Sequence, residues 1–315
     1  MGNDDGKHGH GHDHDHDHDH GHGHDRGHRH GQDPDFDWEA MALRLEGDAT
    51  MVLPIVDDIV QSLSAQVEWA TATHLLDLGC GPGIVTCALA RHAPVAHVTA
   101  LDSSVPLLAR VRHHAAEAHL ATRVHTVEAD IETALPALRP MDVVWAGMVL
   151  HHLADPGEVL AGLLHALQPG GTLVMLEFAG APAALPDDDP LAVDGTWARL
   201  EAATTAARNE RLGLDPVTVD WAALLTGAGF TGITDTTMVA HHRAPLEATA
   251  REWLERHVRS GIEFVGDALS AADVAALTAL AHQVSTRNDL FVSMERRVLT
   301  ARRPIRGGDW EPPAE

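Results

Sequence analysis

The feature that most constrains the fold is a glycine-rich turn within HLLDLGCGPG, residues 74–83. The leucines before the turn predict a short buried strand, and the residues after it predict a helix. Gly79, Gly81 and Gly83 fall at every second position of the turn. Glycine permits positive φ and lets a ligand approach the backbone, while the free N–H groups of the helix start favour a polar or anionic group. A strand, a glycine turn and a helix in this order predict a cofactor-binding crossover.

The chain beyond this turn continues to alternate between apolar strands and helices. The predicted strands cover residues 74–78, 97–102, 124–130, 142–148, 172–178, 232–240 and 290–301. The predicted helices cover residues 84–92, 103–120, 192–212 and 219–228. One further helix is capped by Asp155 and ends at Pro169 to Gly171. Near-continuous apolar strands between helices indicate a parallel sheet with both faces covered, so the predicted fold class is α/β.

The spacing of the glycines identifies a family. The pattern is G-x-G-x-G with Asp77 two residues ahead, whereas a dinucleotide fingerprint would be G-x-G-x-x-G. This pattern closely resembles motif I of class I S-adenosylmethionine (SAM)-dependent methyltransferases, and the resemblance extends from about Leu75 to Phe178. It implies a Rossmann-like, doubly wound, mostly parallel seven-stranded sheet whose last strand is antiparallel. A tight turn without a ligand and an NAD-dependent oxidoreductase are the alternatives.

The resemblance also implies a set of SAM-binding residues. These are Asp77, Gly79, Cys80, Gly81, Gly83, Asp102, Ser103, Asp130, Ile131, Ala146 and Gly147. Asp102, at the end of the second strand, would accept hydrogen bonds from the ribose hydroxyls. Asp130 would accept from the adenine amino group with Ile131 beside the ring, and Ala146 and Gly147 would line the methionine part. The alternative for both acids is an ordinary turn residue at a strand end.

Methyl transfer from a sulfonium is an in-line displacement, so alignment and desolvation supply most of the catalysis. A base is needed only where the acceptor must lose a proton, and histidine suits that task near neutral pH. His152, after the fourth strand, is the predicted base, and His151 is the weaker candidate. A structural role without catalysis is the alternative for both. After the fourth strand the sequence is AGMV and not D/N-P-P-Y/F, the motif of enzymes that methylate DNA or protein glutamine amides. The resemblance therefore does not extend to those enzymes.

The resemblance implies that the segments that flank the core form the acceptor site. Residues 36–315 form the predicted methyltransferase domain, with a helical cap at 36–70, a SAM-binding core at 74–180 and a helical insertion at 246–286. Two helices are expected in the cap, with Pro54 in the first turn of the second one. Ordinary helices packed on the sheet are the alternative to a cap. The acceptor is expected to be a small molecule whose identity these segments set.

Charge and cysteine content restrict the partners and the location. The net charge of −24 should repel phosphate backbones, which disfavours nucleic acid. Arginines 296, 297, 302, 303 and 306 form one basic cluster, interpreted as a solvated strand face and tail. The two cysteines show no metal or disulfide spacing, and no apolar run suits a membrane helix or a signal peptide. A cytoplasmic protein is therefore predicted, and its oligomeric state stays open.

The first 35 residues form a tail rich in histidine and aspartate that should be disordered without a ligand. Imidazole and carboxylate groups suit divalent zinc, nickel or copper. The predicted metal ligands are His10, His12, His14, His16, His18, His20, His22 and His24. The alternative function is therefore a metal-binding protein with the methyltransferase-like body as scaffold or sensor. A solvated tail that binds metal only as any histidine-rich peptide does is the other interpretation.

Overall fold

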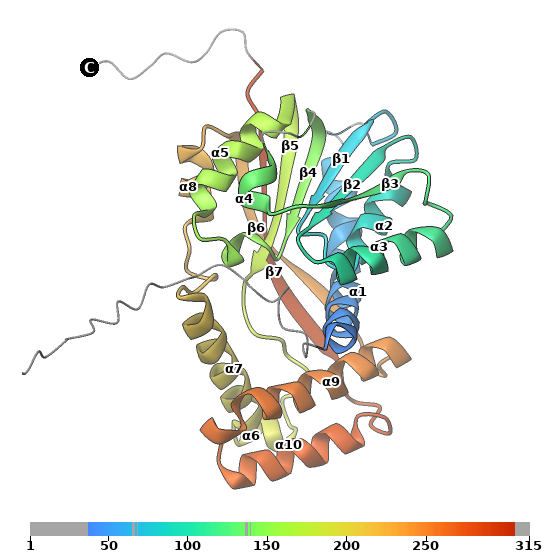
Figure 1. The fold of residues 1–315 in the computed structure, drawn as a ribbon. Coiled ribbons are helices and arrows are strands. Elements are labelled where there is room, and N and C mark those ends of the chain that lie inside the picture. The colour runs from blue at the N-terminus through green and yellow to red at the C-terminus, as the bar shows by residue number, and fades with distance from the viewer. Residues whose placement is uncertain (1–36, 65–66, 68, 136–137, 139, 306–315) are drawn as a thin grey trace, which may run out of the picture.

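The computed structural model describes residues 37–64, 67, 69–135, 138 and 140–305. The predicted tail and its histidines lie outside these residues. The described chain forms a seven-stranded sheet of order β3-β2-β1-β4-β5-β7-β6, with helices on both faces (Figure 1). The strands are β1 (His74–Leu78), β2 (His97–Asp102), β3 (Val124–Glu128), β4 (Met141–Gly147), β5 (Leu167–Phe178), β6 (Thr231–His242) and β7 (Val292–Arg302). This confirms the predicted fold class.

The pairing of the strands also agrees with the prediction. Strands β1 to β5 are parallel to one another, and β7 runs antiparallel to both β5 and β6. The chain reverses from β4 outward, so the carboxyl ends of β1 and β4 lie side by side at the centre of the sheet. In an open parallel sheet this switch in strand order is where ligands bind.

Helices cover the two faces and one end of the sheet. They are α1 (Trp38–Leu63), α2 (Ile84–His92), α3 (Val105–Glu117), α4 (Ile131–Ala134), η3 (Leu150–His152), α5 (Pro156–Ala166), α6 (Pro190–Val193), α7 (Thr196–Leu212), α8 (Trp221–Gly227), α9 (Ala248–Val265), η4 (Gly266–Ala268) and α10 (Ala271–Gln283). Asp155 caps α5 through its side chain, as predicted, and Ser104 caps α3 in the same way. Helix α5 ends at Ala166 rather than at the Pro-Gly-Gly segment, because Leu167 is already extended and pairs with Met141 of β4.

Two apolar clusters hold these layers together. One cluster fills the face covered by α1, α2 and α3 and extends to Trp253 on α9. The other fills the opposite face, under α5 and α8, and includes Trp221. Burial of alternate strand side chains on both faces explains why the central strands read as apolar throughout.

The amino-terminal segment corrects one prediction. Residues 38–63 form one continuous helix with Pro54 inside it, not two helices with Pro54 in the first turn of the second. Met51, Ile55 and Ile59 are almost fully buried in the first cluster, on both sides of the proline. Burial of this unbroken apolar stripe outweighs the hydrogen bond that proline removes from the helix.

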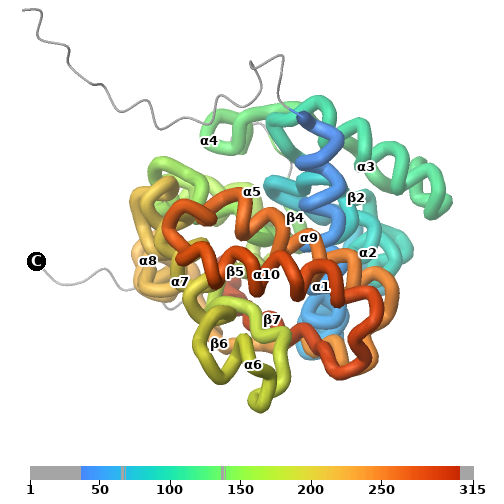
Figure 2. The backbone as a smooth tube through the Cα atoms, turned by 90° about the horizontal axis from the view of Figure 1, so that it is seen from below, coloured from blue at the N-terminus to red at the C-terminus, as the bar shows by residue number. Residues whose placement is uncertain are grey.

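Helices α6, α7, α9 and α10 form a block beyond one end of the sheet (Figures 1 and 2). Helices α9 and α10 occupy the predicted insertion. Trp253 on α9 donates from Nε1 to Asp48 Oδ1 on α1 at 2.8 Å, and His257 on α9 lies 2.7 Å from Glu201 on α7. The first contact ties the block to the body, and the second joins two helices of the block. No helix of the described residues is long and apolar enough to cross a membrane.

Candidate cofactor and acceptor site

The glycine turn lies at the carboxyl end of β1, and all three of its glycines have positive φ. A Cβ atom on Gly79 would lie 2.4 Å from Val149 Cγ2, and one on Gly83 would lie 2.8 Å from Val111 Cγ2. A Cβ atom on Gly81 would meet nothing within 4 Å. Gly79 and Gly83 are therefore required for packing, whereas Gly81 leaves its backbone open to a ligand.

Asp102 ends the neighbouring strand and faces this turn. Its Oδ2 accepts from Gly81 N at 2.9 Å, and its Oδ1 accepts from Ser104 N at 2.9 Å. Burial raises the pKa of this carboxyl, and the backbone N–H donors oppose that rise. Each oxygen can still accept a second hydrogen bond, so the carboxylate can receive the two ribose hydroxyls. Ser103 is exposed beside it.

Asp77 supports the turn from behind. It is buried, and Thr86 Oγ1 donates to its Oδ2 at 2.6 Å. Burial raises the pKa of Asp77 to about 7, against the lowering effect of the Thr86 hydrogen bond. Cys80 is buried as well, and burial raises the pKa of its thiol. Both side chains therefore act through the shape of the turn.

Asp130 follows β3 and caps α4, where its Oδ1 accepts from Glu132 N at 2.8 Å. Its side chain is exposed, so Asp130 can cap the helix as an ordinary turn residue and still contact a ligand. Ile131 is half-buried beside it. Glu132 Oε1 accepts from Ala154 N at 3.1 Å, which ties this loop to the segment that follows β4.

The end of β4 contributes backbone atoms rather than side chains to the candidate site. Ala146 is fully buried in the second apolar cluster, so its methyl group faces the core. Gly147 is half-buried, and a Cβ atom there would lie 2.9 Å from Trp145 Nε1. Met148 follows with φ of 58° and donates from its backbone N to Leu176 O at 2.8 Å. Of the two residues predicted to line the methionine part of SAM, Gly147 is therefore better placed than Ala146.

A buried histidine and glutamate pair lies next to this strand end. His151 Nδ1 is 2.6 Å from Glu177 Oε2, with exposures of 3% and 0%. The His152 ring is half-buried and stacks at a tilt on His151, with centroids 4.1 Å apart. Phe178, the last residue of β5, lies 5.1 Å from the His151 ring. Glu177 was missed by sequence reasoning, although an acid near the end of an otherwise apolar strand is a signal for it.

The basic cluster on β7 is not a solvated strand face, which corrects that prediction. Arg296 is 8% exposed, and Arg297 forms a half-buried ion pair with Asp235 of β6. Arg303 donates from Nη1 to His165 O at 3.1 Å. The reason is that β7 is an inner strand between β5 and β6, and most of its side chains are buried or half-buried.

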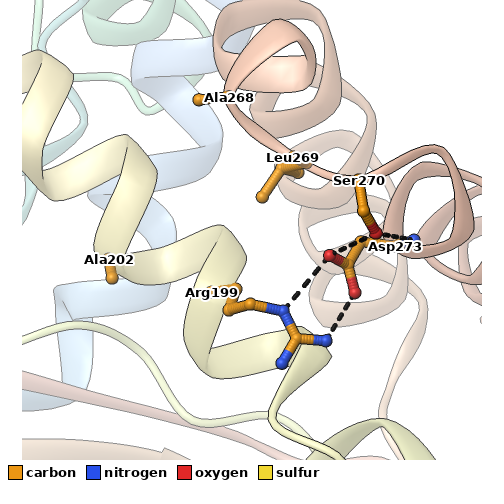
Figure 3. A pocket seen from close by; sticks show the side chains of 6 residues that line it. All are labelled: Arg199, Ala202, Ala268, Leu269, Ser270 and Asp273. Carbon is orange, nitrogen blue, oxygen red and sulfur yellow. Dashed lines mark hydrogen bonds and ion pairs between the residues drawn. The ribbon is translucent and has the colours of Figure 1, made fainter.

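An open pocket of about 590 Å³ lies between α7, η4 and α10 (Figure 3). Arg199 and Asp273 form an ion pair across it, with 2.5 Å between Nη2 and Oδ1. Ser270 Oγ donates to Asp273 Oδ2 at 2.8 Å. These polar groups satisfy one another, so they fix α7 to α10. In the part of the chain that the structure describes, no three His, Cys, Asp or Glu residues are grouped to hold a metal.

Residues 76–175 match the family model described as "Methyltransferase domain". Trans-aconitate 2-methyltransferase of Azoarcus sp. (strain BH72) is 35% identical over 115 residues, which cover 36% of this chain and 43% of that protein. Ubiquinone biosynthesis O-methyltransferase of Xylella fastidiosa (strain 9a5c) is 35% identical over 105 residues, which cover 33% of this chain and 41% of that protein.

The matched segments thus span less than half the length of these two relatives. The crystal structure of Haemonchus contortus phosphoethanolamine N-methyltransferase 2 in complex with S-adenosyl-L-methionine has a TM-score of 0.43 and 16% identity, and the match covers 74% of this chain and 49% of that chain. The family match falls on the glycine turn and the central strands described above. Residues 76–175 are a methyltransferase domain of the class I SAM-dependent type.

Proposed function

We propose that the whole chain is a SAM-dependent methyltransferase that transfers a methyl group to oxygen, nitrogen or carbon of a small molecule. The observation that supports this most is the open backbone of Gly81 beside the carboxylate of Asp102. Bound SAM would supply the activated methyl group. The names of two relatives give an organic acid and an O-methylation in a biosynthetic step, which supports a small acceptor.

The residues around the turn would hold the cofactor in parts. Asp102 would accept from the ribose hydroxyls, and Asp130 would accept from the adenine amino group with Ile131 against the ring. The backbone of Gly147 would line the methionine part. These residues end four strands of one sheet edge, which fits a ligand that lies along the edge.

We further propose that His151 is the base where the acceptor must lose a proton. Its Nδ1–H would donate to Glu177, and this fixes the tautomer in which Nε2 is free to accept a proton. Glu177 would also stabilise the imidazolium that forms. His152 remains a candidate, but the ion-pair geometry favours its neighbour because Glu177 orients His151.

The cofactor assignment is tested by calorimetry on the full chain with SAM, S-adenosylhomocysteine and NAD. SAM and S-adenosylhomocysteine should bind, and Asp102→Ala should weaken both by tenfold or more. The reason is the loss of two charge-assisted hydrogen bonds, each worth on the order of 1.5–3 kcal/mol. Glu128→Ala is the matched control, because Glu128 is an exposed acid of β3 that lies opposite Asp102 of β2 in the strand register. Binding of NAD alone would overturn the proposal.

The base assignment is tested by turnover of three variants. His151→Ala should lower turnover by roughly 100-fold with little effect on SAM affinity, as expected for loss of a general base. Glu177→Gln should also lower turnover and should change the pH dependence of kcat, which a purely structural loss would not do. His152→Ala should retain most activity. Loss of turnover in His152→Ala alone would return the role to His152.

The sequence of the tail carries a second proposal, a divalent zinc, nickel or copper site on its alternating histidines. It rests on the HDHDHDHDH pattern of residues 12–20. The cytoplasmic location is likewise a proposal, supported by Cys80 and Cys87, which are both buried and unpaired.

A further inference from the structure

Two guanidinium groups lie against one aromatic ring at the end of β5. Arg208 Cζ of α7 is 4.0 Å from the centroid of the Phe178 ring, and Arg296 Cζ of β7 is 5.6 Å from it. Phe178 in turn contacts the ring of His151. The two arginines therefore lie one side chain away from the proposed base, on the side of the helical block.

These two arginines lack the counter-ion that buried arginines usually have. Within the described part of the chain, neither one forms an ion pair, whereas Arg199, Arg287 and Arg297 each do. Arg208 donates only to the Asn209 side chain, and Arg296 donates from Nη1 to Glu295 O. The Nε atom of Arg296 is buried and has no hydrogen-bond partner there.

Burial lowers the pKa of both guanidinium groups, and for Arg296 the charges of Asp48 and Glu177 oppose this while the positive charge of Arg208 adds to it. Two like charges that are partly removed from water repel each other, and a bound anion would relieve that repulsion. A buried donor without a partner is also costly until a ligand accepts from it. Both observations point to a ligand with negatively charged oxygen atoms.

We propose that Arg208 and Arg296 bind a carboxylate of the methyl acceptor. This inference rests on the proposed function, since it names the chemical class of the acceptor at the same site. A planar carboxylate matches the fork of a guanidinium, and its charge of −1 suits the acids nearby. Glu177 and Asp48 act electrostatically on Arg296, and Glu201 and Asp215 act on Arg208. These four acids disfavour a doubly charged phosphate.

The proposal also explains why Phe178 ends β5. Its ring separates the charged groups from the His151–Glu177 pair while it packs against both sides. The acceptor would be anchored through its carboxylate on the arginines and would present its reacting atom to His151. Arg208 and Arg296 would thus determine specificity.

The test measures the binding of two monocarboxylates, sodium benzoate and sodium acetate, to the full chain by calorimetry, with and without S-adenosylhomocysteine. Benzamide serves as the uncharged comparison, and sodium phosphate serves as the tetrahedral anion. We expect at least one carboxylate to bind saturably, and benzamide and phosphate to bind at least tenfold more weakly. Arg208→Met and Arg296→Met should each weaken carboxylate binding by tenfold or more.

Arg211→Met is the matched control, because Arg211 is an exposed arginine on the same helix that lies over the Phe264 ring at 5.9 Å. It should bind carboxylate as the unaltered chain does. Circular dichroism of each variant checks its fold, and Arg208→Met decides the question if Arg296→Met does not fold. Equal binding of benzamide, tighter binding of phosphate, no saturable carboxylate binding or full affinity in Arg208→Met would each overturn the inference. Failure of S-adenosylhomocysteine to bind would instead overturn the proposed function, since the carboxylate is measured without it as well.

Discussion

At the scale of residues, neighbouring positions of one turn have different physical duties. Gly79 and Gly83 cannot carry a Cβ atom, because it would clash with Val149 and Val111 respectively. Gly81 has room for a Cβ atom, and only its φ of +53° favours glycine there. Asp77 and Asp102 also have different roles. Asp77 is buried behind the turn, whereas Asp102 faces the turn. Stability and binding should therefore respond separately to substitution here.

Gly79→Ala and Gly81→Ala separate these two duties. Both place alanine at positive φ, which costs about 1–2 kcal/mol. Gly79→Ala also drives a Cβ atom into Val149, so it should lower the free energy of unfolding by about 2–4 kcal/mol in all. Gly81→Ala should lose little more than the φ strain, yet should weaken SAM binding by tenfold or more. Urea unfolding and calorimetry check the pair, and equal stability losses would contradict the contact-based account.

Asp77 should make stability depend on pH. Its pKa is about 7 in the folded chain and 3.8 as the reference value, so between pH 4 and 7 the folded state holds a proton that the unfolded state has lost. The free energy of unfolding should therefore fall as pH rises through this window, on the order of 4 kcal/mol in total. Asp77→Asn should remove this fall and be the more stable chain at pH 8.

The measurement is the difference in urea unfolding between Asp77→Asn and the unaltered chain at pH 4 to 8, because every other titratable group is common to both chains. The exposed acid Asp188 supplies the control variant Asp188→Asn, which should show no such difference. A pH-independent difference for Asp77→Asn would mean that Asp77 is ionised in the folded chain throughout.

At the scale of elements, α1 shows burial overriding local preference. Pro54 is exposed on the outer side of this helix, and its ring removes the N–H that would bond to the carbonyl of Thr50. The apolar stripe on the inner side keeps the helix continuous through that defect. The helix should therefore carry a local cost that substitution can relieve.

Pro54→Ala should raise the free energy of unfolding by about 1–3 kcal/mol, because alanine restores the hydrogen bond and suits a helix interior. The greater freedom of alanine in the unfolded chain offsets part of this gain. Asp58→Ala, an exposed change one turn later, is the control and should stay within about 0.5 kcal/mol. Thermal and urea unfolding measure both, and a destabilised Pro54→Ala would mean that the proline is required for the shape of α1.

At the scale of the whole molecule, the body consists of one sheet with a helical block over the end where the site lies (Figure 1). The block contacts that end through Arg208 of α7, and Trp253 of α9 joins the block to α1. No residue of the tail belongs to the SAM pattern. Cofactor binding and any metal binding should therefore be separable.

A chain that starts at Asp35 tests this separation. It should keep its fold and its SAM affinity, and it should lose most of the zinc, nickel or copper that elemental analysis finds on the full chain at neutral pH. Metal must displace protons from imidazole, so binding to the full chain should weaken steeply below about pH 6. Equal metal on both chains would exclude the tail as the site, and loss of SAM binding would link the tail to the enzyme.

The sequence by itself determined the strand, turn and helix at residues 74–92, because glycine spacing and strand periodicity act over a few residues. It also predicted the seven strands and the antiparallel β7 through its family resemblance. The cap Asp155 was predictable from the sequence for the same local reason.

Only the tertiary structure decided what depends on distant partners. Glu177 meets His151 across 26 residues of sequence, and Arg296 is buried on an inner strand beside the Phe178 ring. Pro54 stays inside one helix because residues from other elements bury the stripe on both sides of it. Local propensity contains no term for such contacts, since the free energy of burial depends on which surfaces the whole chain brings together.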